Sequence, residues 1–329
     1  MLFLFFFEKQ HVLNTVSMKK NITISLLSVF FLFSCNSSDE SKPTKDNNTV
    51  INKPFTEGII EMGIFSNDVD LGKIIGKIDF SRDDVNQQYE ALVANDTDAK
   101  TIFEVIENTS NQNPLVAWAM SMNISECTYF IKDKVVLGNV RGFGWNMHNY
   151  HNTAEDKGSI YLETVTQLDK IAEQDRKIYS EFKPSENAGA NATNTIDFSE
   201  FNRQVELKKQ NVLGYECDVI IYTPKRVDNT MPMQLQKIAV YTSPLFSNTI
   251  NFTHPFYLEE NTGILRLDIY YLNNEEPTLV MKPKAIKEQV INQQDLASKT
   301  TTPIYSSDDM NWGFKALAIM MSGWGAIEQ

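Results

Sequence analysis

Short runs of alternating apolar and polar residues dominate the chain from about residue 56 to residue 290. Isoleucine-rich runs at 58–66 and 72–80 carry glycines that suit bends or bulges in strands. Two further runs within 128–140 flank a turn at 132–134, which predicts a hairpin. Similar runs continue to residue 290. The pattern predicts a mainly β domain, a long antiparallel meander that forms a curved sheet or half-barrel wrapped around a helical segment.

The interval between residues 83 and 108 has a different period. Its apolar side chains recur at helical spacing, and a polar run at 95–98 interrupts them. We expect two helices that share one apolar face. Residues 114–125 then alternate large and small side chains, as in a strand of a curved sheet, whereas residues 185–197 are small and polar and predict a loop.

The C-terminal segment, residues 291–329, ends in a short apolar helix. Residues 306–309 supply capping side chains and acidic charge for its beginning. Its apolar residues occupy almost every side of the helix, so they should be buried or partnered. Two interpretations stay open: the helix packs on the domain's own core, or it is a lid over an apolar cavity. The cavity or lid residues would be Trp312, Phe314, Leu317, Met320 and Met321.

Residues 1–34 differ in kind from the rest of the chain. The apolar run from Leu2 to Phe7 is too short to cross a membrane. Met18 is a better start, because Lys19 and Lys20 precede an apolar stretch of signal-peptide length. The pattern predicts an export leader.

The leader ends in Leu-Phe-Ser-Cys, Leu32 to Cys35. This resembles the lipobox of bacterial lipoproteins, which implies cleavage before Cys35, acylation of its thiol and anchoring to the bacterial outer membrane. Residues 35–55 are polar and predict a disordered tether. Asp39 and Glu40 resemble a surface-export tag, but they also suit a plain solvated linker. The side of the membrane, periplasm or cell surface, stays open.

Charge narrows the range of partners. The chain carries 30 Lys+Arg and 42 Asp+Glu, a formal net charge of −12. Residues 1–34 contain three lysines and one glutamate, so the rest has 27 basic against 41 acidic residues, a net charge of −14. Such a chain repels phosphate backbones, and nucleic acid is not expected as a partner. The hydrophobic content of 42% is sufficient for a core in the domain 56–290.

Three cysteines are present, and lipidation would consume Cys35. Cys127 and Cys217 then form an even pair in an oxidising compartment, which allows a disulfide. Both lie in strand-like runs, so two small buried apolar residues are the alternative.

Catalytic signatures are missing from the sequence. It has no GxSxG, HExxH, phosphate-binding loop or CxxC pair, and Gly142-Phe143-Gly144 suits only a strand or turn. His148 and His151, beside Met147, are weak candidates for a metal site. Residues three apart on a strand point to opposite faces, so the two imidazoles would chelate together only in a turn. No cofactor is expected, and the abundant carboxylates single out no acid pair.

The order of elements carries a second resemblance. The strand region around 128–150, the run VLGYECDVIIYT at 212–223 and a later strand at 238–243 follow the early helical region. This succession resembles uncharacterised periplasmic lipoproteins with the LolA-like half-barrel. The resemblance covers roughly residues 56–290. It implies a concave apolar face able to hold an acyl chain, and it supplies no catalytic residues.

The sequence thus favours a non-enzymatic, lipid-tethered envelope protein that binds an apolar or lipidic ligand. The alternative is a surface-exposed adhesion or assembly module that recognises an unidentified protein. A hydrolase with an unrecognised acidic site is the third hypothesis.

Overall fold

The structure is a computed structural model of the chain. It divides into two units, Met1–Asn47 and Asn48–Gln329. The described residues all belong to the second unit and comprise 51–112, 126–167, 171–186, 200–226, 235–253, 258, 260–271, 275–306 and 309–327. Within these ranges, no helix combines the length and the apolarity needed to span a membrane.

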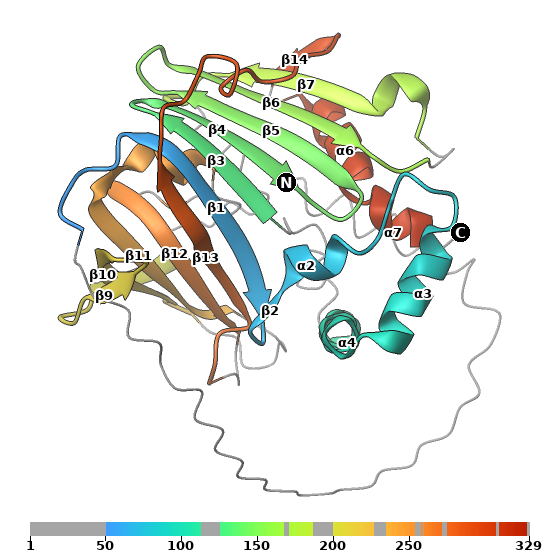
Figure 1. Ribbon diagram of the computed structural model, residues 1–329, viewed down its shortest axis with the longest axis horizontal. Coiled ribbons are helices and arrows are strands. Elements are labelled where there is room, and N and C mark those ends of the chain that lie inside the picture. Colours follow the sequence, from blue (N-terminus) through green and yellow to red (C-terminus); the bar gives the residue numbers. More distant parts are fainter. Residues whose placement is uncertain are drawn as a thin grey trace, which may run out of the picture. The chain divides into compact units, whose positions relative to one another are not determined.

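Nearly half of the described residues lie in strands, which form one large, curved, unclosed sheet (Figure 1). The first half of the sheet contains β1 (Glu57–Ser66), β2 (Val69–Asp70), β3 (Glu126–Lys132), β4 (Val135–Arg141), β5 (Trp145–Asn152), β6 (Lys157–Thr164), β7 (Lys177–Phe182) and β14 (Ile304–Ser306). The second half contains β8 (Phe201–Val205), β9 (Gln210–Val212), β10 (Tyr215–Pro224), β11 (Leu235–Ser247), β12 (Thr262–Tyr271) and β13 (Leu279–Glu288). The mainly β, antiparallel prediction is therefore confirmed.

The two halves are meanders joined by a single strand pair. The strand order is β14-β7-β6-β5-β4-β3-β1-β13-β12-β11-β10-β8, with β2 on β1 and β9 on β10. β1 lies antiparallel to β13, with Ile60 opposite Ile286 and a bulge at Glu61–Met62. β14 is parallel to β7.

Helices account for the rest of the regular structure in the described ranges. They are α2 (Leu71–Ile75), α3 (Val85–Asn95), α4 (Thr97–Gln112), α6 (Met310–Met320), α7 (Ser322–Ile327) and the 3-10 helices η1 (Glu173–Asp175) and η3 (Asn248–Thr253). The predicted helix pair at 83–108 is confirmed as α3 and α4. Asp96 separates the two helices, and its carboxylate accepts a hydrogen bond from the Ala99 N–H (2.9 Å).

One strand prediction is wrong. The run at 72–80 forms α2 and turns, and Asp70 caps α2 by accepting a hydrogen bond from the Gly72 N–H (3.0 Å). Short apolar runs do not by themselves distinguish a strand from a buried helical turn. The strand predicted at 114–125 and most of the loop predicted at 185–197 lie outside the described residues.

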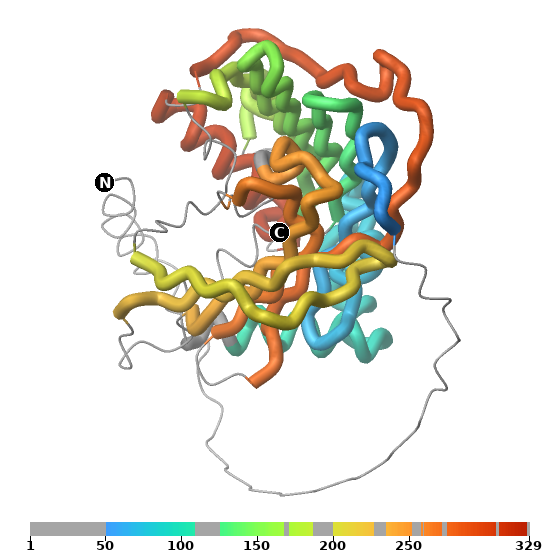
Figure 2. Tube along the Cα trace, turned by 90° about the vertical axis from the view of Figure 1, so that its left-hand side faces the viewer, coloured from blue at the N-terminus to red at the C-terminus, as the bar shows by residue number. Residues whose placement is uncertain are grey.

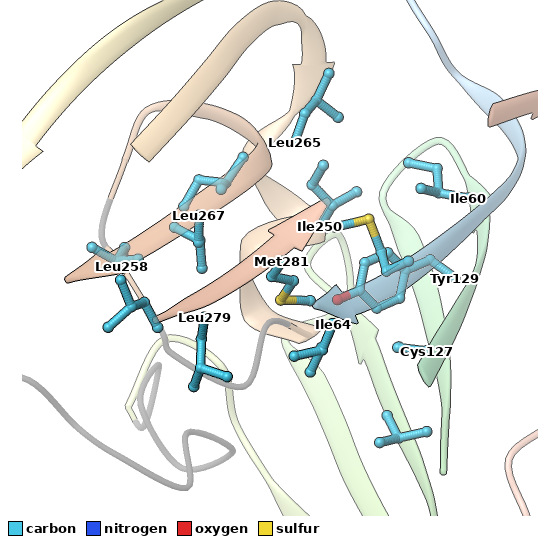
Figure 3. Packing of buried hydrophobic residues seen from close by; sticks show 14 of the residues in the cluster. Ile60, Ile64, Cys127, Tyr129, Ile250, Leu258, Leu265, Leu267, Leu279 and Met281 are labelled. Carbon is cyan, nitrogen blue, oxygen red and sulfur yellow. The ribbon is translucent and has the colours of Figure 1, made fainter. Parts of the chain in front are cut away.

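The main core lies on one face of the sheet, which we call the inner face. Alternate residues of both halves meet there, among them Ile60, Tyr129, Leu267 and Met281 (Figure 3). η3 contacts β3, β4 and β5 of the first half and also β12 of the second. Because one short helix reaches both halves, the inner face is the concave side.

A strap, residues 289–303, crosses the outer face of the first half after β13 ends. Ile291 and Leu296 are buried there against Leu137. Lys299 extends the contact to β6 through an ion pair with Glu163 (2.6 Å). The strap leads into β14, which lies at the edge of the sheet beside β7, and the chain continues into α6 (Figure 1).

A second, smaller core joins α2, α3, α4 and α7. Its centre is aromatic: the Phe143 ring lies 4.7 Å from that of Phe80 and 4.6 Å from that of Trp324. Trp324 thereby connects the C-terminal helix pair to the early helical region.

Candidate functional site

The helix α6 lies against β6 and β7 on the inner face. Trp312, Ile319 and Met320 form its buried side and belong to the main core. The helix begins at Asp309, whose carboxylate accepts a hydrogen bond from the Asn311 N–H (2.8 Å). Asp309 is one of the capping residues that the sequence predicted.

The opposite side of α6 carries a second apolar stripe. It consists of Met310, Phe314, Leu317 and Met321, whose spacing of four, three and four residues places them on one helix face. Met310 is 64% exposed and Phe314 is 49% exposed. Leu317 and Met321 are half-buried at the margin of the main core. We call this set the α6 stripe.

The five C-terminal residues predicted for a cavity or lid are therefore divided between two surfaces. Trp312 and Met320 belong to the buried side of α6, whereas Phe314, Leu317 and Met321 belong to the α6 stripe. The sequence prediction treated all apolar residues of the helix alike, so it did not distinguish the buried side from the exposed side.

Polar contacts fix the rotation of α6 about its axis. Lys315 forms an ion pair with Asp175 of η1. The hydrogen bond that Lys315 donates to the Asp175 carboxylate raises the pKa of Lys315, whose ammonium also lies 5.8 Å above the centre of the Tyr305 ring. These contacts lie between the buried side and the α6 stripe, so they hold the stripe away from the sheet.

The helix α7 packs on the turn between β4 and β5. The Ser322 hydroxyl donates a hydrogen bond to the Gly144 carbonyl (3.1 Å) and accepts one from Thr164 (2.8 Å). Gly144 has a φ of +81°, which suits glycine. The Gly142-Phe143-Gly144 run is thus a turn, one of the two conformations that its sequence allowed.

His148 and His151 occupy opposite faces of β5. His151 is completely buried on the inner face, where its Nε2 lies 3.0 Å from the Asn149 Oδ1. Burial lowers the pKa of His151 to about 3. On the outer face, the His148 Nδ1 accepts a hydrogen bond from the Lys299 N–H of the strap (3.3 Å). Desolvation, followed by the charge of Lys299, lowers the pKa of His148.

The two histidines therefore do not converge on one point. Among the described residues, no group of three or more His, Cys, Asp or Glu side chains is arranged to hold a metal ion. His254, the third histidine after the leader, lies outside the described residues.

Cys127 of β3 and Cys217 of β10 are buried free thiols. Burial raises the pKa of both, that of Cys217 to about 12. In this state each thiol behaves as a small apolar residue of the main core. Cys35 lies outside the described residues.

Two buried carboxylates were not identified from the sequence. Glu260 receives two hydrogen bonds from the Arg203 guanidinium (3.0 and 2.9 Å) and one from the Tyr222 hydroxyl. Arg203 and Glu260 are far apart in the sequence, which is why spacing gave no signal. The pairing neutralises the charge of Glu260 and occupies both its oxygens.

The second buried carboxylate, Asp268, has a similar environment on the outer face of β12. Arg266 donates two hydrogen bonds to it (2.7 and 2.8 Å), and the Tyr241 hydroxyl donates a third (2.8 Å). Removing one partner of such a carboxylate would leave a buried charge uncompensated and destabilise the fold. With their oxygens already hydrogen-bonded, Glu260 and Asp268 offer no free acid or base for catalysis.

A depression of about 740 Å³ lies beside the β1–β2 turn and α2. Its lining mixes Asp68, Asp70 and Asp98 with Lys73 and Lys77, and Lys77 is already paired with Asp96. None of the residues singled out from the sequence lines it. Its mixed charges favour no particular ligand class.

Comparison with known proteins adds little. No protein-family model matches the sequence, and no curated protein matches it. Among solved structures, PNGF-II in a P21 crystal form matches 59% of this chain and 30% of its own chain, with 9% identity and a TM-score of 0.34. PNGF-II in a C2 form matches 57% and 30%, with 9% identity and a TM-score of 0.29. Likeness at this level carries no argument about the present chain.

Proposed function

We propose that this protein is a bacterial envelope lipoprotein, held at the outer membrane by acyl chains on Cys35, that binds an apolar or lipidic ligand without catalysis. In this proposal the curved sheet is a half-barrel around α6 and η3, and the ligand lies along the α6 stripe. The observation that carries the proposal is the stripe itself, an apolar helix face with two strongly exposed members, Met310 and Phe314.

Energetics support a ligand at this position. Complete burial of a large apolar side chain contributes about 1.5–3 kcal/mol. Exposed apolar residues are ordinary when scattered singly, whereas a contiguous set on one helix face is typical of a binding surface. The opposite side of α6 is fixed in the core by Trp312, so the stripe is presented by a rigid support.

The ligand proposal is tested with protein purified from the envelope under mild conditions. Mass spectrometry of its organic extract should detect a copurified lipid or other apolar compound. A Met310→Ser, Phe314→Ser double variant, which changes the two strongly exposed members of the stripe, should lose most of that compound and take up less apolar dye, while its melting temperature stays near the parent's. Asn311→Ser, on an exposed polar position of the same helix, is the control and should retain both. Equal ligand content in all three proteins would refute the proposal.

The anchor proposal has an independent test. Acyl transfer requires the thiol, so Cys35→Ser should stay unprocessed and incorporate no radiolabelled palmitate. Normal cleavage and acylation of that variant would exclude the lipoprotein assignment.

A protein-interaction module is the second candidate. β8 supports it, because this strand forms one edge of the sheet and four of its five residues are exposed. Exposed edges can accept a strand from another chain. A ligand-free protein that copurifies with a stoichiometric partner would favour this function over the first.

A further inference from the structure

The point where the described chain begins is defined by two backbone contacts. The Ile51 N–H donates a hydrogen bond to the Gly214 carbonyl (3.0 Å), and the Phe55 N–H donates one to Leu245 (2.8 Å). Gly214 lies in the turn between β9 and β10. Figures 1 and 2 both show the blue start of the chain beside this yellow hairpin. The segment from Cys35 therefore reaches the domain at the β9–β10 turn.

The same hairpin carries unusually exposed apolar side chains. Leu207, between β8 and β9, is fully exposed. Val205 at the end of β8 is 51% exposed, and Leu213 in the β9–β10 turn is 50% exposed. Val205 lies opposite Ile220, five residues along β10 from the pair that closes the turn, so we use the name hairpin tip for Leu207 and Leu213 alone.

Leu213 also has an unfavourable backbone conformation. It has a φ of +48° and Gly214 a φ of +91°, in a two-residue turn closed by the Val212–Tyr215 pair. Such turns strongly prefer asparagine, aspartate or glycine at the position of Leu213. A leucine there is both conformationally costly and exposed, and rule-breaking residues of this kind concentrate at functional sites.

We infer that the hairpin tip inserts into the surface of the lipid bilayer to which Cys35 anchors the protein. The inference rests on the lipid anchor proposed above. Fifteen residues, 36–50, connect Cys35 to Ile51. A segment of this length spans at most about 55 Å when fully extended. The anchor thus holds Ile51 and the hairpin beside it within that distance of the bilayer, and the tip is an apolar surface at this end of the domain.

The charges around the tip indicate which kind of lipid is needed. Lys209 is paired with Glu216 (2.9 Å) and lies 3.6 Å from Asp218. With Lys208 and Glu206 beside Leu207, the tip has no excess of positive charge. The contact is apolar, so it does not require anionic lipid and is insensitive to salt.

A site-specific probe tests the inference in the acylated full chain, reconstituted into vesicles of neutral phosphatidylcholine. Leu207→Cys allows an environment-sensitive fluorophore to be attached, because Cys127 and Cys217 are buried and Cys35 is acylated. Its emission should shift to shorter wavelength on reconstitution and should be quenched by lipids brominated near the headgroup. Gln87→Cys, exposed on α3, is the matched control and should show neither change.

A second variant separates membrane contact from a structural role. Leu213→Asn, introduced into the labelled Leu207→Cys protein, should raise the melting temperature because asparagine suits the turn, and should weaken the quenching. A purely structural role of Leu213 predicts instead that quenching is unchanged. An acylated protein whose label at position 207 stays in water overturns this inference and leaves the anchor intact. A protein that carries no acyl chain overturns both.

Discussion

Gly144 and Gly323 pass each other with no room for a side chain: a Cβ on Gly144 would lie 2.6 Å from the Gly323 Cα. The backbone of α7 is therefore seated directly on the turn between β4 and β5. This contact brings Trp324 onto the Phe143 ring and fixes the base from which α6 extends.

Gly144→Ala should destabilise the fold by about 2–4 kcal/mol, since it combines a strained positive φ with overpacking. The free energy of unfolding, measured by urea titration, gives the effect. Gly313→Ala in α6 is a matched control, because a Cβ there meets no atom within 4 Å. It should stabilise the protein by about 0.5–1 kcal/mol through helix propensity. Similar losses in both variants would contradict the close contact.

The two sides of α6 should respond differently to truncation. Trp312→Ala removes a buried indole and should cost about 3–5 kcal/mol of stability. Phe314→Ala, in the α6 stripe, should cost less than about 1 kcal/mol. Denaturant titration followed by circular dichroism compares them. An equal cost would mean that the stripe packs against the core as firmly as the buried side does.

His151 should make the fold sensitive to acid. Unfolded, its imidazole gains a proton below about pH 6.5, whereas its folded pKa is about 3. Between these values the unfolded state binds more protons than the folded state. The stability that the neutral His151 contributes is therefore fully present above pH 6.5 and decreases as the pH falls below that value. This residue alone contributes a slope of up to about 1.4 kcal/mol per pH unit. His151→Gln should show a shallower loss of unfolding free energy between pH 6.5 and 4, and an unchanged slope would contradict a buried neutral imidazole.

The two domain cysteines should be unreactive in the native protein. Burial raises both pKa values, so little thiolate forms at neutral pH and reagents have no access. Iodoacetamide should leave Cys127 and Cys217 unmodified until denaturant is added, and should then modify both. Mass analysis after denaturation without reductant also tests the disulfide that an even cysteine count allows. Two alkylated cysteines indicate free thiols, whereas a linked pair of peptides indicates the bridge.

Local patterns predicted most of the elements. The helix pair around Asp96, the β3–β4 hairpin and the cap at Asp309 all follow from neighbouring residues, which is why periodicity and capping chemistry found them. The strand prediction at 72–80 was wrong because it also relied on a local pattern. The five residues of α2 are too few for a helical period to appear.

The arrangement of the sheet was beyond local reasoning. The pairing of Ile60 with Ile286, and of Arg203 with Glu260, joins residues whose separation in sequence carries no periodic signal. The division of α6 into a buried side and an exposed stripe also depends on where β6 and β7 lie. For the same reason the exposed leucine in the β9–β10 turn became visible only with its backbone angle and its contact to Ile51.

The β1–β13 pair has a consequence for biosynthesis. Among the described strands, β1 is made first and β13 last but one, yet they join the two meanders at the centre of the sheet. A chain that crosses a membrane N-terminus first can form β3 to β7 early, but β1 keeps one unpaired edge until residue 288 has emerged. High contact order of this kind slows folding and leaves an aggregation-prone edge in the meantime. If the protein is exported as proposed above, we expect its export to depend on a chaperone that shields β1 during that interval.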